Sequence, residues 1–256
     1  MPDLGILNLA DIWPYILVGF AAQMVDGALG MAFGVISSTL LVSVLGVPPA
    51  QASAGVHLAE VFTTGASGLS HAWHRNIDWP LFARLVLPGV AGGVLGAYVL
   101  ANIDAGVARP LVMVYLASVG VVLLYRAWRF PTPRFEDPRI VAPLGAAGGF
   151  LDAAGGGGWG PVVTSNLLIQ GSEPRKTIGT VSASEFFLTV SISLTFILTL
   201  GFEAFTHATI GLLVGGVVAA PFGAVLAKNV QPRLLLLMVG GVLTITSLFS
   251  IYKALA

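Results

Sequence analysis

Four acidic residues stand inside long apolar stretches of the chain, namely Asp26, Glu60, Asp152 and Glu185. An ionised acid at the centre of a membrane-spanning helix costs about 2.5–3.5 kcal/mol on insertion scales. Four such groups together would cost about 10 kcal/mol, which is comparable to the stability of a whole domain. We therefore expect these acids to face a watery cavity, to be protonated or to accept hydrogen bonds. A carboxyl group partly withdrawn from water can also load and release a proton during transport.

Each aspartate stands beside a glycine-rich stretch, and this position allows two interpretations. The sequence reads MVDGALGMAFG around Asp26 and FLDAAGGGGWG around Asp152. Aspartate side chains often cap a helix terminus, so these two acids either take part in proton transfer or pin the end of a broken helix. Glu60 and Glu185 lie within longer regular stretches, and for them we favour proton coupling.

Polar side chains recur every three or four residues around Glu60, so they share one face of a predicted helix. Serine and threonine on such a face often do no more than bond one membrane helix to another. Histidine together with glutamate indicates a path for protons or solute instead. We assign His57 to proton coupling with the four acids, and Thr64, Ser182 and Thr189 to the lining of the path.

Other chemistry is not expected. His57 and Glu60 lie one helical turn apart, as in half of a metal site, but the second half of the chain has serine at the position of the histidine and no HExxH motif occurs. The chain has no cysteine, which excludes disulfides and thiol chemistry. No motif pairs a nucleophile with a base. We therefore expect no metal, no cofactor and no enzymatic activity.

The composition predicts a protein surrounded by lipid. Of its 256 residues, 56% are hydrophobic and 9% are charged, whereas about a quarter of the residues of a soluble domain are charged. The mean hydropathy is +0.90. The net charge is zero, which gives no indication of a nucleic-acid partner. The acidic start MPDLGILNLADIWP is not expected to be a cleaved signal peptide, because it has no basic region.

Eight apolar segments follow one another along the chain, at residues 13–45, 49–73, 79–101, 110–128, 140–170, 174–200, 207–227 and 232–254. A single membrane crossing needs about 20 residues. The first and fifth segments are too long for one crossing and too short for two, and glycine interrupts each near its middle. This pattern predicts a broken or re-entrant helix, whose irregular backbone must be covered by protein or line a cavity.

The two halves of the chain repeat each other. With an offset of 126, Asp26 aligns with Asp152 and Phe33 with Trp159; with an offset of 125, Glu60 aligns with Glu185. Acids are rare at membrane depth, so chance similarity between apolar helices does not explain the match. We expect an all-α membrane protein with two repeats of four segments, at residues 1–128 and 140–256, joined by a linker at 129–139.

The distribution of cations predicts that the repeats are inverted. Lys and Arg collect on cytoplasmic loops, and the linker with its flanks carries Arg126, Arg129, Arg134 and Arg139. If the first and fifth segments return to the side they entered, each half crosses the membrane three times and ten of the twelve cations fall on the linker side. Inverted repeats with broken helices are typical of secondary transporters. We predict a multi-pass protein of the cell inner membrane with a cytoplasmic linker.

The glycine runs predict an anion site. Glycine disfavours helix by about 1 kcal/mol relative to alanine, but it bares the backbone N–H groups that begin the next helix, and these attract anions. Close packing of helices is the other interpretation, and a run of four glycines matched by a second break makes it insufficient. The predicted substrate-binding residues are Gly30, Phe33, Gly34, Ser37, Ser38, Gly156, Gly157, Gly158, Trp159, Gly160, Thr164, Ser165 and Asn166.

The chain resembles the sulfite exporter (TauE/SafE) family of membrane transporters. The resemblance is carried by the paired glycine breaks, by LGVPPAQASAGVHLAE with GSEPRKTIGTVSASEFF, and by NIDWPLFARLVLPGVAGGVLGAYV. It implies transport of sulfite, thiosulfate or small organosulfonates across the bacterial inner membrane, in either direction. The expected partners are therefore a small anionic solute and the lipid bilayer. The first repeat reads DGALGMAFG where many members of the family have a denser glycine run.

Two readings of the transport remain open. A proton-coupled secondary transporter is the leading interpretation, and a passive channel for small anions is the alternative. Fold alone does not decide between them. The sequence also leaves open whether the protein is a monomer or a homodimer.

Overall fold

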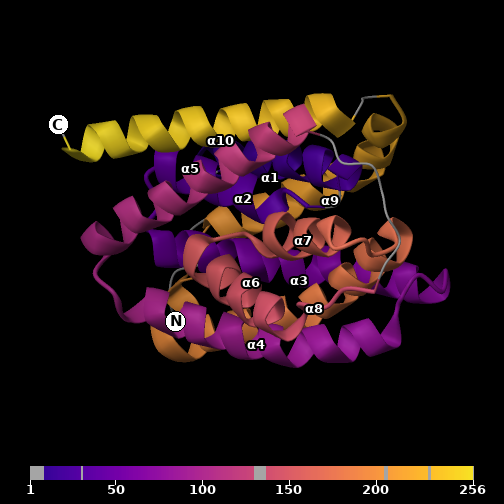
Figure 1. Ribbon diagram of the computed structural model, residues 1–256. Helices are drawn as coiled ribbons and strands as arrows, with labels where there is room; N and C mark the ends of the chain where they lie inside the picture. Colours follow the sequence, from indigo (N-terminus) through magenta and orange to yellow (C-terminus); the bar gives the residue numbers. More distant parts are fainter. Residues whose placement is uncertain (1–8, 30, 130–136, 205–206, 230–231, 256) are drawn as a thin grey trace.

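The computed structural model describes residues 9–29, 31–129, 137–204, 207–229 and 232–255. In this part of the chain every regular element is helical (Figure 1). The elements are α1 (Leu9–Leu29), α2 (Phe33–Thr39), η1 (Leu40–Val44), α3 (Pro49–Trp73), α4 (Trp79–Asn102), α5 (Ala105–Arg129), α6 (Ala142–Gly155), η2 (Trp159–Thr164), α7 (Ser165–Ile169), α8 (Pro174–Leu200), η3 (Phe202–Ala204), α9 (His207–Asn229) and α10 (Pro232–Leu255).

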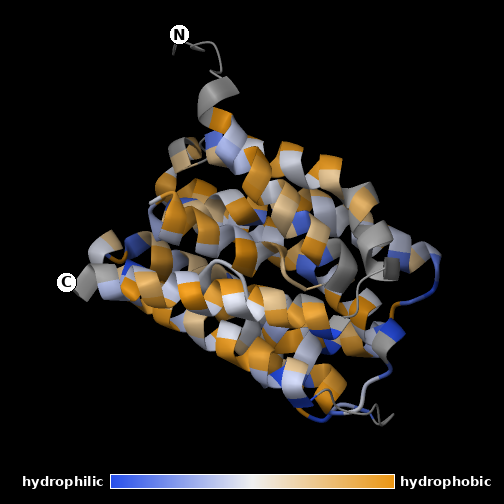
Figure 2. Ribbon diagram, turned by 90° about the horizontal axis from the view of Figure 1, so that it is seen from above, coloured by the Kyte–Doolittle hydropathy of each residue, from blue (hydrophilic) through white to orange (hydrophobic). Residues whose placement is uncertain are grey.

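The helices carry apolar side chains on their outer faces, as a lipid surrounding requires. Among the described residues, α4, α5 and α8 are long and apolar enough to cross a membrane. Large apolar side chains such as Trp73, Tyr125 and Leu198 are exposed on the surface, and apolar residues cover much of the helices in Figure 2. The prediction of an all-helical membrane protein is therefore confirmed.

Both long segments are broken near the predicted glycines. In the first, α1 ends at Leu29 and α2 begins at Phe33; in the second, α6 ends at Gly155 and η2 begins at Trp159. We call α1, α2 and η1 hairpin one, and α6, η2 and α7 hairpin two. Gly30 and residues 130–136 of the linker lie outside the described residues, so the predictions made for them are not addressed.

Hairpin two returns to the side from which it starts. The side-chain oxygen of Gln170, directly after α7, accepts hydrogen bonds from the backbone N–H groups of Arg139 and Ile140 at 3.0 and 2.9 Å. Its amide nitrogen donates to the carbonyl of Ile140 at 3.1 Å. Near the turn, a Cβ atom on Gly148 of α6 would touch Val163 of η2. Both ends of hairpin two therefore lie together.

The helices of the two halves pack in reciprocal pairs. Helix α1 packs along α9, and α6 packs along α4, so the first helix of each half contacts the third long helix of the other. Helices α3 and α8 pack together, as do α5 and α10. Figure 1 shows α10 beside α5 along one edge of the molecule, with α4 and α6 along the opposite edge.

Most predicted boundaries are confirmed to within two residues, but the first and fourth segments begin earlier than expected, the first at Leu9 instead of residue 13. We predicted a start at Pro110, because proline suits the first helical turn, whereas α5 begins at Ala105 and contains Pro110. The side chain of Asp104 accepts a hydrogen bond from Gly106 N–H, and its carbonyl accepts from Val107 and Ala108. These bonds start the helix one turn ahead of the proline.

Cationic side chains hold loops together at the end of the molecule where hairpin two starts. Arg84 donates to the carbonyls of Pro138 and Arg139 at 3.3 and 3.5 Å. Lys176 donates to the carbonyls of Arg75 and Ile77 at 2.9 and 3.4 Å. At the other end of α4, Arg109 donates to the carbonyl of Val42 at 2.5 Å. The side chain of Lys253 is not among those described.

Candidate functional site

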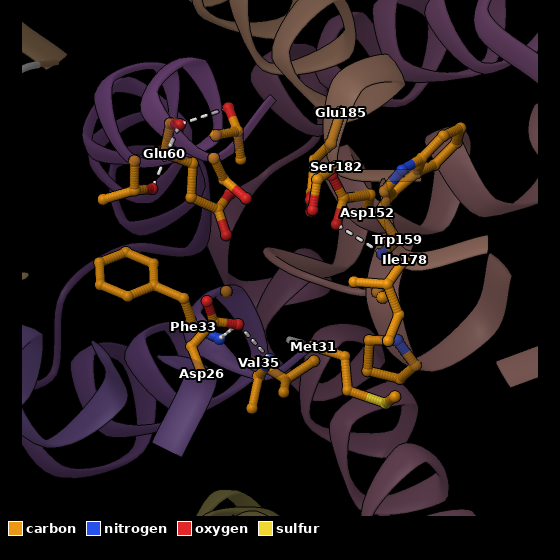
Figure 3. Close-up of a pocket in the computed structure, with 18 of the residues that line it drawn as sticks. Asp26, Met31, Phe33, Val35, Glu60, Asp152, Trp159, Ile178, Ser182 and Glu185 are labelled. Carbon is orange, nitrogen blue, oxygen red and sulfur yellow. Dashed lines mark hydrogen bonds between the residues drawn. The ribbon is translucent and has the colours of Figure 1, made fainter. Parts of the chain in front are cut away.

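A cavity of about 360 Å³ lies between the two breaks, against α3 and α8. Figure 3 shows acidic side chains entering it from both halves of the chain, with Glu60 on one side and Glu185 on the other. Its full lining is Gln23, Asp26, Met31, Ala32, Phe33, Gly34, Val35, Glu60, Thr63, Thr64, Ser67, His71, Asp152, Gly158, Trp159, Gly160, Pro161, Ile178, Ser182 and Glu185.

The two aspartates make matching contacts at the two breaks. Oδ1 of Asp26 accepts from the N–H groups of Ala32 and Phe33 at 2.7 and 3.1 Å. Oδ1 of Asp152 accepts from the N–H group of Trp159 at 2.8 Å. Each carboxyl group therefore binds the backbone where the second helix of its hairpin begins. This is the geometry of the helix-pinning interpretation, and it occurs in both halves.

The two glutamates face the cavity from the helices that pack between the hairpins. Glu60 is 5% exposed, and its Oε2 atom is buried without a hydrogen-bond partner among the described residues. A Cβ atom on Gly34 would lie 3.1 Å from Oε1 of Glu60. A buried polar atom with no partner is rare in folded proteins. The Glu60 carboxyl group is therefore placed to bind a proton, a water molecule or a solute in the cavity.

The glycines of hairpin two form the turn and bring the hairpins together. Gly156 ends α6 with φ +75°, and Gly157 follows with φ +142°, a region that other residues rarely adopt. A Cβ atom on Gly157 would collide with the backbone of Gly34 and Val35 in hairpin one. The two breaks thus meet backbone to backbone, and this contact requires glycine at position 157.

Backbone donors remain open at this turn. Gly158 and Gly160 line the cavity. Within the described part of the chain, their N–H groups have no acceptor. The N–H group of Trp159 between them is taken by Asp152. Two residues of the cavity lining therefore carry backbone donors without an acceptor among the described residues.

Slightly more than half of the predicted site residues line the cavity. Those that do are Asp26, Phe33, Gly34, Glu60, Thr64, Asp152, Gly158, Trp159, Gly160, Ser182 and Glu185. Those that the structure places behind the cavity wall are Ser37, Ser38, His57, Gly156, Gly157, Thr164, Ser165, Asn166 and Thr189.

Three of the hydroxyl and amide groups predicted beyond the breaks, those of Ser38, Ser165 and Asn166, contact the protein itself. Ser38 donates to the carbonyl of Gly156, joining the two hairpins. Asn166 donates to the carbonyl of Val162 at 2.6 Å, and Ser165 contacts the sulfur of Met31 at 3.7 Å. The cavity therefore reaches only the first turn after each break.

Gln23, Met31, Thr63 and Tyr115 are among the residues at this site that sequence reasoning missed. Gln23 lines the cavity one helical turn before Asp26, and this spacing could have indicated it. Met31 lines the cavity within the first break. Tyr115 of α5 donates from its hydroxyl to the carbonyl of Gly157 at 3.0 Å, and nothing in the sequence around it indicates that contact.

The Tyr115→Phe variant should be destabilised without losing its fold. The substitution leaves the carbonyl of Gly157 without its donor, and an unsatisfied buried acceptor costs about 1–3 kcal/mol. We expect a lower thermal unfolding temperature in detergent. Tyr98→Phe is the matched control, since Tyr98 is exposed on α4. Equal unfolding temperatures for the two variants would show that the Tyr115 bond does not support the turn.

Comparison with known proteins agrees with this architecture. The sequence model of the family described as "Sulfite exporter TauE/SafE" matches residues 15–250. A curated protein of Bacillus subtilis (strain 168), "Probable membrane transporter protein YtnM", is 42% identical over 235 residues, covering 89% of this chain and 78% of that protein. No solved structure matches. The matched family and relative indicate a membrane transporter rather than an enzyme, and the chain belongs to the TauE/SafE sulfite exporter family.

Proposed function

We propose that the protein is a secondary transporter that carries a small sulfur oxyanion across the cell inner membrane together with protons. The substrate class is sulfite, thiosulfate or a small organosulfonate. One observation supports this most strongly: four carboxyl groups and two open backbone donors surround one cavity between the two breaks. The membership of the sulfite exporter family supports the choice of a sulfur oxyanion.

The charges around the cavity support proton coupling. The described lining contains four acids and one histidine but no Lys or Arg. Two like charges about 5 Å apart repel by about 3 kcal/mol at an effective dielectric constant of 20. An anion therefore shares this cavity only with carboxyl groups that are neutral. Binding of the anion and binding of protons to Glu60 and Glu185 thus support each other.

The anion is held by neutral donors in this proposal. The N–H groups of Gly158 and Gly160 bind its oxygen atoms, together with the hydroxyl groups of Thr63, Ser67 and Ser182 along α3 and α8. A protonated Glu60 adds an O–H donor through the carboxyl group whose Oε2 atom has no hydrogen-bond partner among the described residues. Phe33 and Trp159 form the apolar wall beside these donors.

Two inverted repeats complete the proposal, with residues 1–128 and 140–256 as the repeats and 129–139 as a cytoplasmic linker. The reciprocal helix pairs support a two-fold relation between the halves. So does the contact of Thr64 with Thr189, which align at an offset of 125 and whose hydroxyl oxygens lie 3.4 Å apart. A residue beside a two-fold axis lies close to its own counterpart.

In this proposal the cavity opens toward the end of the molecule where Arg84 and Lys176 bind the loops. Its lining continues along α3 from Glu60 through Ser67 to His71, near the loop where Lys176 binds the carbonyl of Arg75. Cationic loops face the cytoplasm in bacterial membrane proteins. In this proposal the described cavity belongs to an inward-open state of the transporter.

Uptake into proteoliposomes tests the substrate class. We expect accumulation of sulfite, thiosulfate or ethanesulfonate when a pH gradient is imposed, and none of the neutral sulfone dimethyl sulfone. Empty liposomes are the control for leakage of sulfurous acid. Equal uptake of the sulfone would contradict an anion carrier. Anion uptake that follows the membrane potential and ignores the pH gradient would establish the passive channel instead.

A further inference from the structure

The contacts of His57 fix which of its ring nitrogens carries a proton. Nδ1 lies 2.7 Å from the carbonyl oxygen of Ser53, which can only accept. The hydroxyl oxygen of Ser53 lies 3.2 Å from the same nitrogen and donates its own proton to the carbonyl of Ala153 at 2.7 Å. Both neighbours of Nδ1 are therefore acceptors, and Nδ1 must be the donor.

The other ring nitrogen then needs one further proton in its bond to Asp152. Nε2 of His57 and Oδ2 of Asp152 lie 3.0 Å apart. A neutral ring protonated at Nδ1 has a lone pair at Nε2, which would repel an ionised oxygen. The pair is therefore either imidazolium with carboxylate or imidazole with carboxylic acid. Moving the proton between the two atoms exchanges these forms and leaves the net charge at zero.

The pair is almost fully buried, with His57 behind the cavity wall and Asp152 in the lining. His57 is fully buried and Asp152 is 3% exposed. The second oxygen of Asp152 accepts from the N–H group of Trp159, so both oxygens are occupied. Through these bonds α3 is fastened to α6 and to the start of η2, on either side of the break in hairpin two.

The first half of the chain has no equivalent pair. At an offset of 125 the position of His57 corresponds to Ser182, which lines the cavity and whose hydroxyl group has no hydrogen-bond partner among the described residues. Asp26, which corresponds to Asp152, is half-buried and lines the same cavity. The two aspartates therefore pin their hairpins alike, but only Asp152 has a partner that can hold a positive charge.

We infer that His57 is a positioning residue whose proton, shared with Asp152, stays in place throughout the transport cycle and fastens hairpin two to α3. The inference rests on the proposed function, and it separates the titratable groups of that function into a fixed pair and a set that exchanges protons. His57 and Asp152 lie outside the proton path, and Glu60, Glu185 and Asp26 are the acids that exchange protons.

Other titratable groups lie near the pair, so its neutrality matters. Asp152 interacts electrostatically with Glu60 of α3, Glu185 of α8 and Tyr115 of α5. Asp26 of α1 acts on the same two glutamates. Without the histidine, an ionised Asp152 would place a negative charge beside the acids that exchange protons.

Two variants of Asp152 separate positioning from proton transfer. In Asp152→Asn the amide can donate to the unprotonated Nε2 of His57 and accept from Trp159 N–H. Hairpin two therefore stays bonded to α3, although the exchangeable acid is gone. We expect uptake of the transported anion that still responds fully to a pH gradient, with a rate within about tenfold of the unmodified protein. In Asp152→Ala both bonds are lost, and we expect no uptake. Loss of the pH response in Asp152→Asn would place the pair in the proton path.

Nitrogen NMR of the unmodified protein in bilayers tests the pair without any transport assay. The chain has four histidines, and His57 is identified by its absence from the His57→Gln spectrum. We expect Nδ1 of His57 to show the shift of a protonated nitrogen, and Nε2 to show a shift that does not change, at every pH at which the protein stays folded. An unprotonated Nδ1, or an Nε2 shift that titrates within this range, would overturn the inference. If the unmodified protein carries no anion, the proposed function fails while this measurement still decides the state of the pair.

Discussion

Replacing Glu60 or Glu185 by glutamine is expected to leave anion binding intact and to weaken the response of transport to a pH gradient. Glutamine keeps the shape of the side chain and a hydrogen-bond donor, but it cannot exchange a proton. Each co-transported proton multiplies the accumulation of substrate by about tenfold per pH unit. Each variant should therefore accumulate less substrate, by the factor of about ten per pH unit that its missing proton contributes. Uptake at a series of imposed pH gradients, with binding measured separately, checks this result.

Glu173→Gln is the matched control for these variants. Glu173 is exposed at the start of α8, and its carboxyl oxygens accept from the N–H groups of Arg175 and Lys176 at 3.2 and 3.1 Å. It lies outside the cavity, so its substitution should leave the pH response unchanged. Retention of the full pH response in both Glu60→Gln and Glu185→Gln would remove these residues from the coupling mechanism.

Replacing Gly157 should have the largest effect on the architecture. A residue other than glycine in this backbone conformation costs about 1–3 kcal/mol, and its Cβ atom would also collide with Gly34 and Val35 across the hairpin contact. We expect Gly157→Ala to lower the unfolding temperature and weaken anion binding, and Gly157→Leu to abolish binding. Thermal unfolding and a binding titration with ethanesulfonate measure both effects.

Gly241→Ala provides the matched control. Gly241 lies within α10, and a Cβ atom there would meet nothing within 4 Å. Alanine is favoured over glycine in a helix by about 1 kcal/mol, so this variant should be as stable as the unmodified protein or more so. If Gly157→Ala behaved like Gly241→Ala, the backbone contact between the hairpins would not hold the site together.

The breaks and the carboxyl groups were predictable because each leaves a local signal. Glycine runs interrupt two segments whose length suits neither one crossing nor two, and an aspartate precedes each run at the same spacing. The alignment of Asp26 with Asp152 and of Glu60 with Glu185 indicated residues that the fold brings around one cavity. The repeat within the chain therefore indicated these four acids without any knowledge of the structure.

The contacts between the halves could not be read from the sequence. The bond of His57 to Asp152 and that of Tyr115 to Gly157 join residues 95 and 42 positions apart, and no local pattern couples them. The extent of the cavity was also hidden. Asn166 lies eight residues beyond Gly158, and its side chain bonds to the carbonyl of Val162 in η2 instead of facing the solute.

The ratio of proton flux to anion flux in proteoliposomes tests the central claim most directly. Internal pH and labelled ethanesulfonate or sulfite are followed in the same vesicles, with the membrane potential clamped. The account predicts that the substrate gradient alone drives protons across the membrane in a fixed ratio to the anion, and that the ratio falls in Glu60→Gln and Glu185→Gln. Anion flux without any accompanying proton movement would contradict the account.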